Sequence, residues 1–280
     1  MTPKKAPPKT RKNDTPPAGN AALSPAARSH NSAGVVRKDL KLKKLENYLL
    51  KKVGKAMLDY EMLGTNDRIL VGVSGGKDSW AMLKLLQLKN RQLPPDKKYT
   101  LVAAHINFQL CEQHDRNFDT LLEPYGIEYH TVTMKLPEKN NRKMSQCFWC
   151  SWNRRKLLFN MCRDYNCTKL ALGHHLDDIA ETMLMNQFFY GEISTMPPNV
   201  SMFKGALNII RPLAYIHEKQ AAEYAKKTSL PFCSCSCPYA KEDSRRKYIK
   251  SLIADIEKRC PYTKINMIRS MKRIKTQYLA

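Results

Sequence analysis

The chain has 280 residues, of which 48 are Lys or Arg and 25 are Asp or Glu, so its formal net charge is +23. A hydrophobic fraction of 42% supports a folded body of one or two domains and excludes a wholly disordered chain. The sequence contains no run of 18 apolar residues and no secretory signal pattern, so it predicts neither a membrane span nor export, while the positive charge favours an anionic partner such as nucleic acid.

The positive charge is concentrated at the two ends of the chain. Residues 1–55 hold 14 Lys/Arg and 3 Asp/Glu, and residues 241–280 hold 12 and 4. Residues 1–36 are rich in Pro, Lys and Ala and are predicted to be a disordered basic tail; their low arginine content and lack of an amphipathic pattern disfavour a mitochondrial transit peptide. Residues 37–66 are predicted to form a basic amphipathic helix, residues 67–240 a catalytic domain, and residues 241–280 a basic helical tail. The basic helix and tail are candidates for contacts to nucleic-acid phosphates.

Between these ends the pattern alternates between strands and helices. Short apolar runs predict strands over 68–73, 101–108, 128–134, 169–173 and 208–212, and longer amphipathic segments predict helices over 77–93, 112–125, 151–165, 177–189 and 217–227. Such alternation predicts an α/β fold, with a Rossmann-like parallel sheet that is covered by helices on both faces.

The sharpest motif, SGGKDS, joins the first strand to its helix. Two glycines let the backbone approach a phosphate, and the helix start supplies free N–H groups and a favourable dipole. The motif satisfies neither the Walker A pattern nor the dinucleotide fingerprint. It predicts a phosphate site in which the lysine neutralises a phosphate and Asp78 holds magnesium. The string resembles the loop of the pyrophosphate-loop ATPases, and this resemblance implies an ATP site at Ser74, Gly75, Gly76, Lys77, Asp78 and Ser79.

Other candidate residues follow the second and fourth strands, whose carboxyl ends meet the same edge of the sheet. His105 and Asn107 are predicted to lie near the adenine, and Gly173 and His174 near the ribose and α-phosphate. The next helix starts with two further candidates, Asp177 and Asp178, each interpreted as a catalytic base, a magnesium ligand or a helix cap. Arg154 is predicted to contact the substrate or to tune the neighbouring cysteines, with a solvated helix face as the alternative.

The chain has nine cysteines, an odd number that favours reduced thiols in a cytosol-like compartment. Cys147-Phe-Trp-Cys150 stands directly before a predicted helix, and Cys-Ser-Cys-Ser-Cys occupies 233–237. The spacing leaves open a redox disulfide, an iron–sulfur cluster that adds one later cysteine, ordinary buried thiols, and a zinc site. The zinc set would be Cys147, Cys150, Cys162 and Cys167.

Five motifs in fixed order resemble the tRNA-cytidine 2-sulfurtransferase (2-thiocytidine) family of PP-loop ATPases. They are SGGKDS, CFWC, the segment KLALGHHLDDIAETMLMNQFFYGEISTMPP over 169–198, IRPLA over 210–214, and CPY over 237–239. The resemblance covers about residues 45–275 and implies an adenine nucleotide alpha hydrolase-like fold, ATP cleaved to AMP and pyrophosphate, and a [4Fe–4S] cluster on three cysteines. By the match of motifs the ligands are Cys147, Cys150 and Cys237, with Cys235 as a rival, because C-S-C-S-C departs from the family's usual pair.

The resemblance also implies a reaction and partners. The C2 oxygen of a tRNA cytidine, at position 32 of the anticodon loop, is adenylated and then replaced by sulfur from a donor such as a cysteine desulfurase. A homodimer and a cytoplasmic location are expected, with a mitochondrial location less favoured. The alternatives are a tRNA 2-thiouridine synthetase, a lysidine synthetase-like adenylating enzyme with structural zinc, and a zinc-stabilised RNA-binding protein. The chain lacks paired C-x-x-C motifs at its ends and has Met-Pro-Pro at 196–198, which favours the cytidine branch.

Overall fold

A computed structural model describes residues 25–108, 118–135, 146–232 and 244–278. By its internal contacts the chain divides into two units, residues 1–41 and residues 42–280. Helix α1 (Pro25–Asp59) crosses this boundary. It begins twelve residues before the predicted helix, at a proline whose missing N–H is no loss in the first turn of a helix.

The second unit is built on a six-stranded sheet, as the alternating pattern predicts. The strands are β1 (Arg68–Gly72), β2 (Thr100–Asn107), β3 (Glu128–Thr133), β4 (Lys169–Ala171), β5 (Asn199–Met202) and β6 (Leu207–Ile210). Their order is β3-β2-β1-β4-β6-β5, and every neighbouring pair is parallel except β5 with β6. The α/β, Rossmann-like prediction is thereby confirmed, with one antiparallel edge strand that the sequence pattern did not predict.

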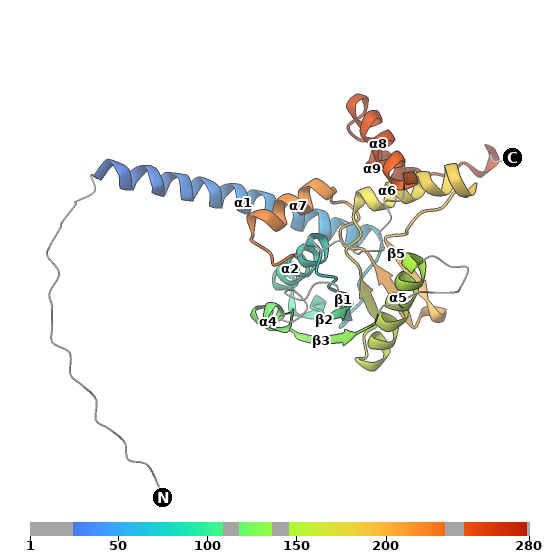
Figure 1. Cartoon of the computed structure of the whole chain (residues 1–280), viewed down its shortest axis with the longest axis horizontal. Coiled ribbons are helices and arrows are strands. Elements are labelled where there is room, and N and C mark those ends of the chain that lie inside the picture. Colours follow the sequence, from blue (N-terminus) through green and yellow to red (C-terminus); the bar gives the residue numbers. More distant parts are fainter. Residues whose placement is uncertain (1–24, 109–117, 136–145, 233–243, 279–280) are drawn as a thin grey trace, which may run out of the picture. The chain divides into compact units, whose positions relative to one another are not determined.

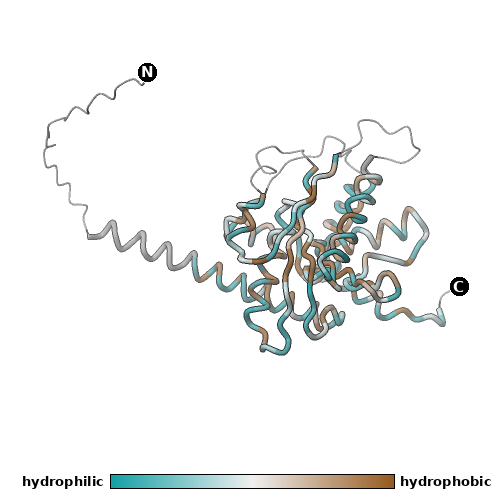
Figure 2. Tube along the Cα trace, turned by 90° about the horizontal axis from the view of Figure 1, so that it is seen from below, coloured by the Kyte–Doolittle hydropathy of each residue, from teal (hydrophilic) through white to brown (hydrophobic). Residues whose placement is uncertain are grey.

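Helices cover both faces of this sheet (Figure 1). One face packs the second half of α1 with α2 (Lys77–Gln92), α4 (Phe118–Leu122) and α7 (Glu218–Lys227). The other face packs α5 (Gln146–Asp164). Because parallel strands are buried on both sides, β1 reads as a continuous apolar run in which Ile69 and Val71 face one core and Leu70 the other. Figure 2 shows these hydrophobic strands in the middle of the folded body.

The remaining helices form a third group at one end of the sheet. They are α6 (Leu176–Met185), continued by the π-helical turn η3 (Asn186–Tyr190), α8 (Ser244–Arg259) and α9 (Thr263–Ser270). Ala180 of α6 packs against Ile249 and Ile253 of α8 in a small apolar cluster. A break between α8 and α9 falls at the predicted position, Pro261. Short 3-10 turns η1 (Pro95–Lys97), η2 (Glu123–Tyr125), η4 (Phe203–Gly205) and η5 (Thr276–Tyr278) complete the described elements.

Several predicted elements are shorter than expected in the described chain, and two of them have a clear cause. The helix predicted over 112–125 is seen only as α4 and η2, because residues 109–117 lie outside the described residues. The last predicted strand, 208–212, ends at Ile210, because Pro212 follows and has no N–H to donate to the sheet. Among the helices of the described chain, none has the length and apolar character needed to cross a bilayer.

Candidate functional site

The loop between β1 and α2 is closed by its own hydroxyl groups. The Ser74 N–H donates to Ser79 Oγ at 3.1 Å, and Ser79 Oγ donates to the Gly76 carbonyl at 2.8 Å. Gly75 adopts a left-handed conformation, with φ of 85°, which glycine reaches without strain. This φ is the reason that glycine is needed at position 75. Ser79, which is only 5% exposed, stabilises the loop through its side-chain hydrogen bonds.

Beside this loop runs the segment that follows β4, and the two approach closely at Gly173. A Cβ atom placed on Gly173 would stand 3.1 Å from the Ser79 backbone nitrogen and 3.2 Å from the Asp78 carbonyl carbon. Both neighbours are backbone atoms, which cannot rotate away as a side chain could. Gly173 therefore lets the ends of β1 and β4 meet at the point where the strand order reverses, the usual ligand position in such sheets.

A cavity of about 520 Å³ opens at this point. Its walls include Ser74 and Asp78 of the loop, Gly173 and His174 after β4, and Arg154 and Arg155 of α5. Two polar atoms of this wall, Asp78 Oδ1 and His174 Nδ1, are buried without a hydrogen-bond partner. Orphaned polar atoms are costly in a folded protein, so their presence in the wall fits a polar ligand that supplies the missing partners.

The electrostatics of the wall favour an anion. Burial, followed by the charge of Arg211, lowers the pKa of His174 to about 4, so this imidazole is neutral at physiological pH. Burial likewise lowers the pKa of Arg211 to about 10, which leaves its guanidinium charged. Arg211 itself does not line the cavity, but Arg154 and Arg155 do, so the wall combines cations with a neutral hydrogen-bonding imidazole. That combination suits a phosphate-bearing ligand.

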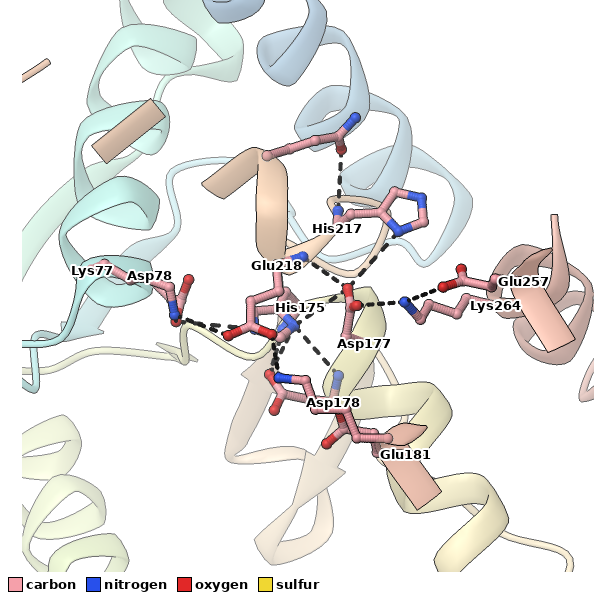
Figure 3. A network of polar contacts seen from close by, with 12 residues as sticks. Lys77, Asp78, His175, Asp177, Asp178, Glu181, His217, Glu218, Glu257 and Lys264 are labelled. Atoms are coloured by element: carbon pink, nitrogen blue, oxygen red, sulfur yellow. Dashed lines mark hydrogen bonds and ion pairs between the residues drawn. The ribbon is translucent and has the colours of Figure 1, made fainter. Parts of the chain in front are cut away.

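Lys77 points from the loop into a network of ion pairs (Figure 3). Its Nζ lies 3.0 Å from Asp78 Oδ2 and 3.3 Å from Glu218 Oε1 at the start of α7. Burial lowers the pKa of Lys77, but the two carboxylates outweigh it and the net pKa is raised. Glu218 in turn lies 2.7 Å from Lys250 Nζ of α8. The phosphate-loop lysine is thus fully charged and joined through one carboxylate to the C-terminal helices.

The two acidic residues at the start of α6 have different surroundings. Asp178 lines the cavity, and its Oδ2 accepts a bond from the His175 backbone N–H at 3.0 Å, in a capping box. Asp177 is not part of the cavity wall. Its carboxylate lies 2.7 Å from Lys264 Nζ of α9 and accepts the Glu218 N–H at 2.8 Å. Helix capping is therefore observed at Asp178, whereas Asp177 joins α6, α7 and α9.

Several predicted nucleotide-binding residues lie near the cavity without lining it. His105 is 3% exposed, donates from Nδ1 to the Val73 carbonyl at 2.8 Å, and stacks on Phe118 at 3.5 Å between ring centroids. It supports the strand that leads into the loop. Asn107, at the end of β2, also stands outside the wall, as do Gly75 and Lys77 of the loop.

The wall also contains residues that sequence reasoning missed. Arg246 of α8 lines the cavity, and its Nε lies 3.0 Å from Glu181 Oε2 of α6. Met196, from the segment between η3 and β5, lines it as well. The basic composition of 241–280 predicted phosphate contacts by this tail, but nothing in that pattern distinguishes Arg246 from its neighbours.

The position of Cys147 and Cys150 corrects one prediction. The C-x-x-C pair was expected before a helix that starts at residue 151, but α5 begins at Gln146, so both cysteines belong to its first turns. Residues 146–150 contain no proline or glycine, and the helix therefore extends through them. Ser151, Arg154 and Arg155, which follow directly, line the cavity. The pair thus stands at the cavity end of α5.

The helix also excludes the zinc set that the spacing left open. Cys162 lies twelve residues after Cys150 on the same helix, a rise of about 18 Å. Cys162 and Cys167 are buried in the core beneath the sheet, where burial is the main cause that raises their pKa values to about 12 and about 11. They are inert structural thiols. Cys235 and Cys237, the candidates for a third cluster ligand, lie outside the described residues.

Comparisons with known proteins agree on one group. Residues 44–256 match the family model of the PP-loop domain. The tRNA-cytidine(32) 2-sulfurtransferase of Geobacter metallireducens is 35% identical over 232 residues, which cover 81% of this chain and 90% of the relative. The enzyme of the same name from Geobacter sulfurreducens is 34% identical over 246 residues, covering 86% and 93%.

A solved structure supports the same assignment. The U34-tRNA thiolase NcsA from Methanococcus maripaludis, with its [4Fe–4S] cluster, superposes with a TM-score of 0.70 at 26% identity and covers 85% of this chain and 82% of its own. Common ancestry with these proteins explains three features of this chain. They are the closed phosphate loop, the cavity where the strand order reverses, and the C-x-x-C motif at the start of α5. The chain belongs to the tRNA-cytidine(32) 2-sulfurtransferase family of PP-loop proteins.

Proposed function

We propose that this chain is an ATP-dependent tRNA thiolase, which replaces the C2 oxygen of cytidine 32 in the anticodon loop with sulfur. One observation carries the proposal. A single cavity is bounded on one side by the phosphate loop and on the other by α5, whose first turns hold Cys147 and Cys150. Cys150 does not line this cavity itself, but Ser151 directly after it does, and this proximity supports a two-step replacement of oxygen by sulfur.

The first step uses the phosphate loop. ATP lies with its phosphates against the loop N–H groups, and Asp78, whose Oδ1 has no protein partner, binds the accompanying magnesium ion. The C2 oxygen of the base attacks the α-phosphorus, the bond between the α and β phosphates breaks, and pyrophosphate leaves. Lys77 exchanges its carboxylate partners for a phosphate oxygen and offsets the charge that develops there. Adenylation makes the C2 oxygen a good leaving group.

In the second step, sulfide attacks C2 and the C2–O bond breaks to release AMP. Arg154, in the cavity wall one helical turn beyond Cys150, is placed to stabilise the phosphate of the departing AMP. Asp178, also in the wall, is the remaining candidate base, while Asp177 holds the surrounding helices together. A cysteine desulfurase-type donor would supply the sulfur as a persulfide, and a two-electron reductant such as a thiol pair would release it as sulfide.

The residues present fit an iron–sulfur cluster. Cys147 and Cys150 occupy a helix start without acidic residues in its first turn, and Arg154 and Arg155 follow, so the local potential favours thiolates. Cys237 would be the third ligand, with Cys235 as its rival. A bound [4Fe–4S] cluster with three protein ligands would supply an open coordination position for sulfur.

A second product, 2-thiouridine, is the main alternative, because the solved relative is a U34-tRNA thiolase. Its fold and its cluster would serve either base. Nucleoside analysis separates the two, because 2-thiocytidine and 2-thiouridine differ in mass and chromatographic retention.

The experiment is a deletion strain complemented with wild type, Cys150→Ala or Cys260→Ala, followed by mass spectrometry of tRNA nucleosides. We expect 2-thiocytidine to disappear on deletion, to return with wild type and Cys260→Ala, and to stay absent with Cys150→Ala. Cys260, which follows α8, is the control thiol. Unchanged 2-thiocytidine in the deletion strain would reject the proposal. Fractionation of the same cells would test the cytoplasmic location, and light scattering of the purified chain would test the homodimer.

A further inference from the structure

The turn that follows α6 places large apolar side chains in water. Phe188 and Tyr190 of η3 are each 59% exposed, Phe189 is 37% exposed, and Ile193 just beyond is 57% exposed. Clustered exposure of this kind is unusual on a protein surface and marks interaction sites. A π-helical turn, which interrupts the regular helix hydrogen bonding, is also frequent at functional positions. We name the side chains of Phe188, Phe189 and Tyr190 the aromatic turn.

The aromatic turn is held in shape by the segment that follows it. Asn186 Nδ2 donates to Ser194 Oγ at 2.7 Å, and the Glu192 N–H donates to the Asn186 carbonyl at 3.0 Å. Thr195 Oγ1 donates back to the Ile179 carbonyl of α6 at 2.6 Å. Because the turn is already ordered, the binding free energy of a partner would not have to offset a loss of conformational entropy in the turn.

Two connections join the aromatic turn to the cavity. Arg245 lies over the Phe189 ring at 5.4 Å from its centroid, and the next residue, Arg246, lines the cavity. Met196, two residues after Ser194, lines the cavity as well. Along α6 and η3, Phe188 is ten residues from the cavity residue Asp178, a rise of about 15 Å. The turn therefore lies beside the site and not on a remote face.

The surroundings of the aromatic turn are cationic. Residues 244–278, which form α8, α9 and the stretch beyond, contain 11 Lys/Arg and 2 Asp/Glu. Cations of this density bind phosphates with release of counterions, and exposed aromatic rings stack on unpaired bases. A second copy of the chain is disfavoured as the occupant, because a two-fold contact at this turn would bring two such cationic segments together.

We propose that the aromatic turn is a stacking surface for unpaired bases of the tRNA loop that presents the target cytidine, with Arg245 directed to the phosphates of the same loop. This proposal rests on the proposed function and specifies where that substrate is held. Base extrusion into a cavity leaves the neighbouring loop bases unstacked, and aromatic side chains are the common replacement partners.

The test measures binding of a fluorescent anticodon stem-loop by anisotropy, without ATP, so that affinity is separated from chemistry. Phe188→Ala with Tyr190→Ala should weaken binding about 10- to 100-fold. Phe188→Tyr should bind as wild type, and Phe188→Leu, which keeps apolar area and loses the aromatic face, should be weakened. The control is Phe203→Ala, a phenylalanine with the same 59% exposure that contacts Phe159 instead. Thiolation by the double variant should show a raised KM for tRNA with kcat retained.

Four outcomes would overturn the proposal. Unchanged RNA affinity in the double variant, or an equal loss in Phe203→Ala, would show that the aromatic turn does not contact the loop. Wild-type affinity in Phe188→Leu would show an apolar contact without stacking. Light scattering that shows loss of a dimer in the double variant, with RNA affinity intact, would assign the turn to a second copy. Failure of the proposed function is distinguishable, because it would leave the affinity changes in place while the deletion strain keeps its 2-thiocytidine.

Discussion

Replacing Lys264 with methionine tests the network that joins α9 to the site. The Lys264 side chain is 12% exposed, and its Nζ lies 2.7 Å from Asp177 Oδ1 and 2.8 Å from Glu257 Oε2. Methionine preserves most of the aliphatic volume but leaves the Asp177 carboxylate, at 8% exposure, without its cation. Removing one partner of a buried ion pair costs about 3–5 kcal/mol, and the lower end applies because the Glu218 N–H still binds Asp177. For a domain of this size, about 3 kcal/mol lowers Tm by roughly 6–12 °C.

The assay is thermal unfolding followed by circular dichroism at neutral pH, with two matched variants. Lys258→Met removes a lysine whose partner Asp255 is 3.0 Å away, but both side chains are about three-quarters exposed, so the expected loss is below ~1 kcal/mol. Lys264→Met combined with Asp177→Asn should recover most of the Tm, because the more deeply buried carboxylate is then neutral and the remaining one, Glu257, is 23% exposed. Equal losses for Lys264→Met and Lys258→Met would refute the reasoning.

The ion pair between Asp177 and Lys264 predicts that the stability of the fold depends on pH. Burial raises the pKa of Asp177, but the Lys264 ammonium and the Glu218 N–H outweigh burial, so the net pKa lies below the ordinary 3.8. The pair therefore contributes stability above about pH 4, and this contribution is lost as the pH falls through the lowered pKa. The difference in Tm between wild type and Lys264→Met should shrink in that acid range. A difference that stays constant down to pH 2 would contradict the assignment to Asp177.

Three further predictions concern the cavity. Gly173→Ala should weaken ATP binding at least about tenfold in calorimetry with a non-hydrolysable analogue, because the new Cβ would press on the Ser79 backbone at 3.1 Å; unchanged affinity would show that the loop can yield. Burial lowers the pKa of His174 to about 4 from 6.5, so the unfolded state binds more protons between these values, and stability should fall as the pH drops from about 6.5 to about 4. His174→Asn should flatten that slope in urea titrations at several pH values. Finally, anaerobically purified Cys150→Ala should lose its iron and sulfide while the buried Cys167→Ala keeps them; loss in both would point to unfolding and not to ligation.

The part of the cavity wall formed by the loop after β1 could be predicted because its information is local. The apolar strand, two glycines and the helix start fall within residues 68–79, so their order in sequence is their order in space. The partner of Lys77 could not be predicted in this way, because Glu218 is 141 residues away and becomes a neighbour only when α7 packs beside α2. The role of Asp177 could not be predicted for the same reason, because it depends on an ion pair with Lys264 of α9, a helix distant in the sequence.

Two other differences between the sequence-based predictions and the structure have local causes. Strand β5 has only four residues, with a half-buried or exposed pattern, and pairs at the sheet edge, so no apolar run marks it in the sequence. His105 lies near the end of the buried strand β2 and is predicted to lie near the adenine, but its ring is buried against Phe118 and its Nδ1 donates to the Val73 carbonyl. A histidine at the end of a strand has the same sequence signature in either role.

The carboxylate of Glu218 has one further consequence. One oxygen faces Lys77 of the phosphate loop at 3.3 Å and the other faces Lys250 of α8 at 2.7 Å. If an anion binds Lys250 and moves it away, Lys77 remains as the only lysine paired with the Glu218 carboxylate. If a nucleotide binds Lys77 instead, Lys250 remains as its only lysine partner. Occupancy at one end therefore changes the free energy of occupancy at the other, and by thermodynamic linkage the change is equal in both directions. The affinities for two polyanionic substrates are then coupled through a single side chain.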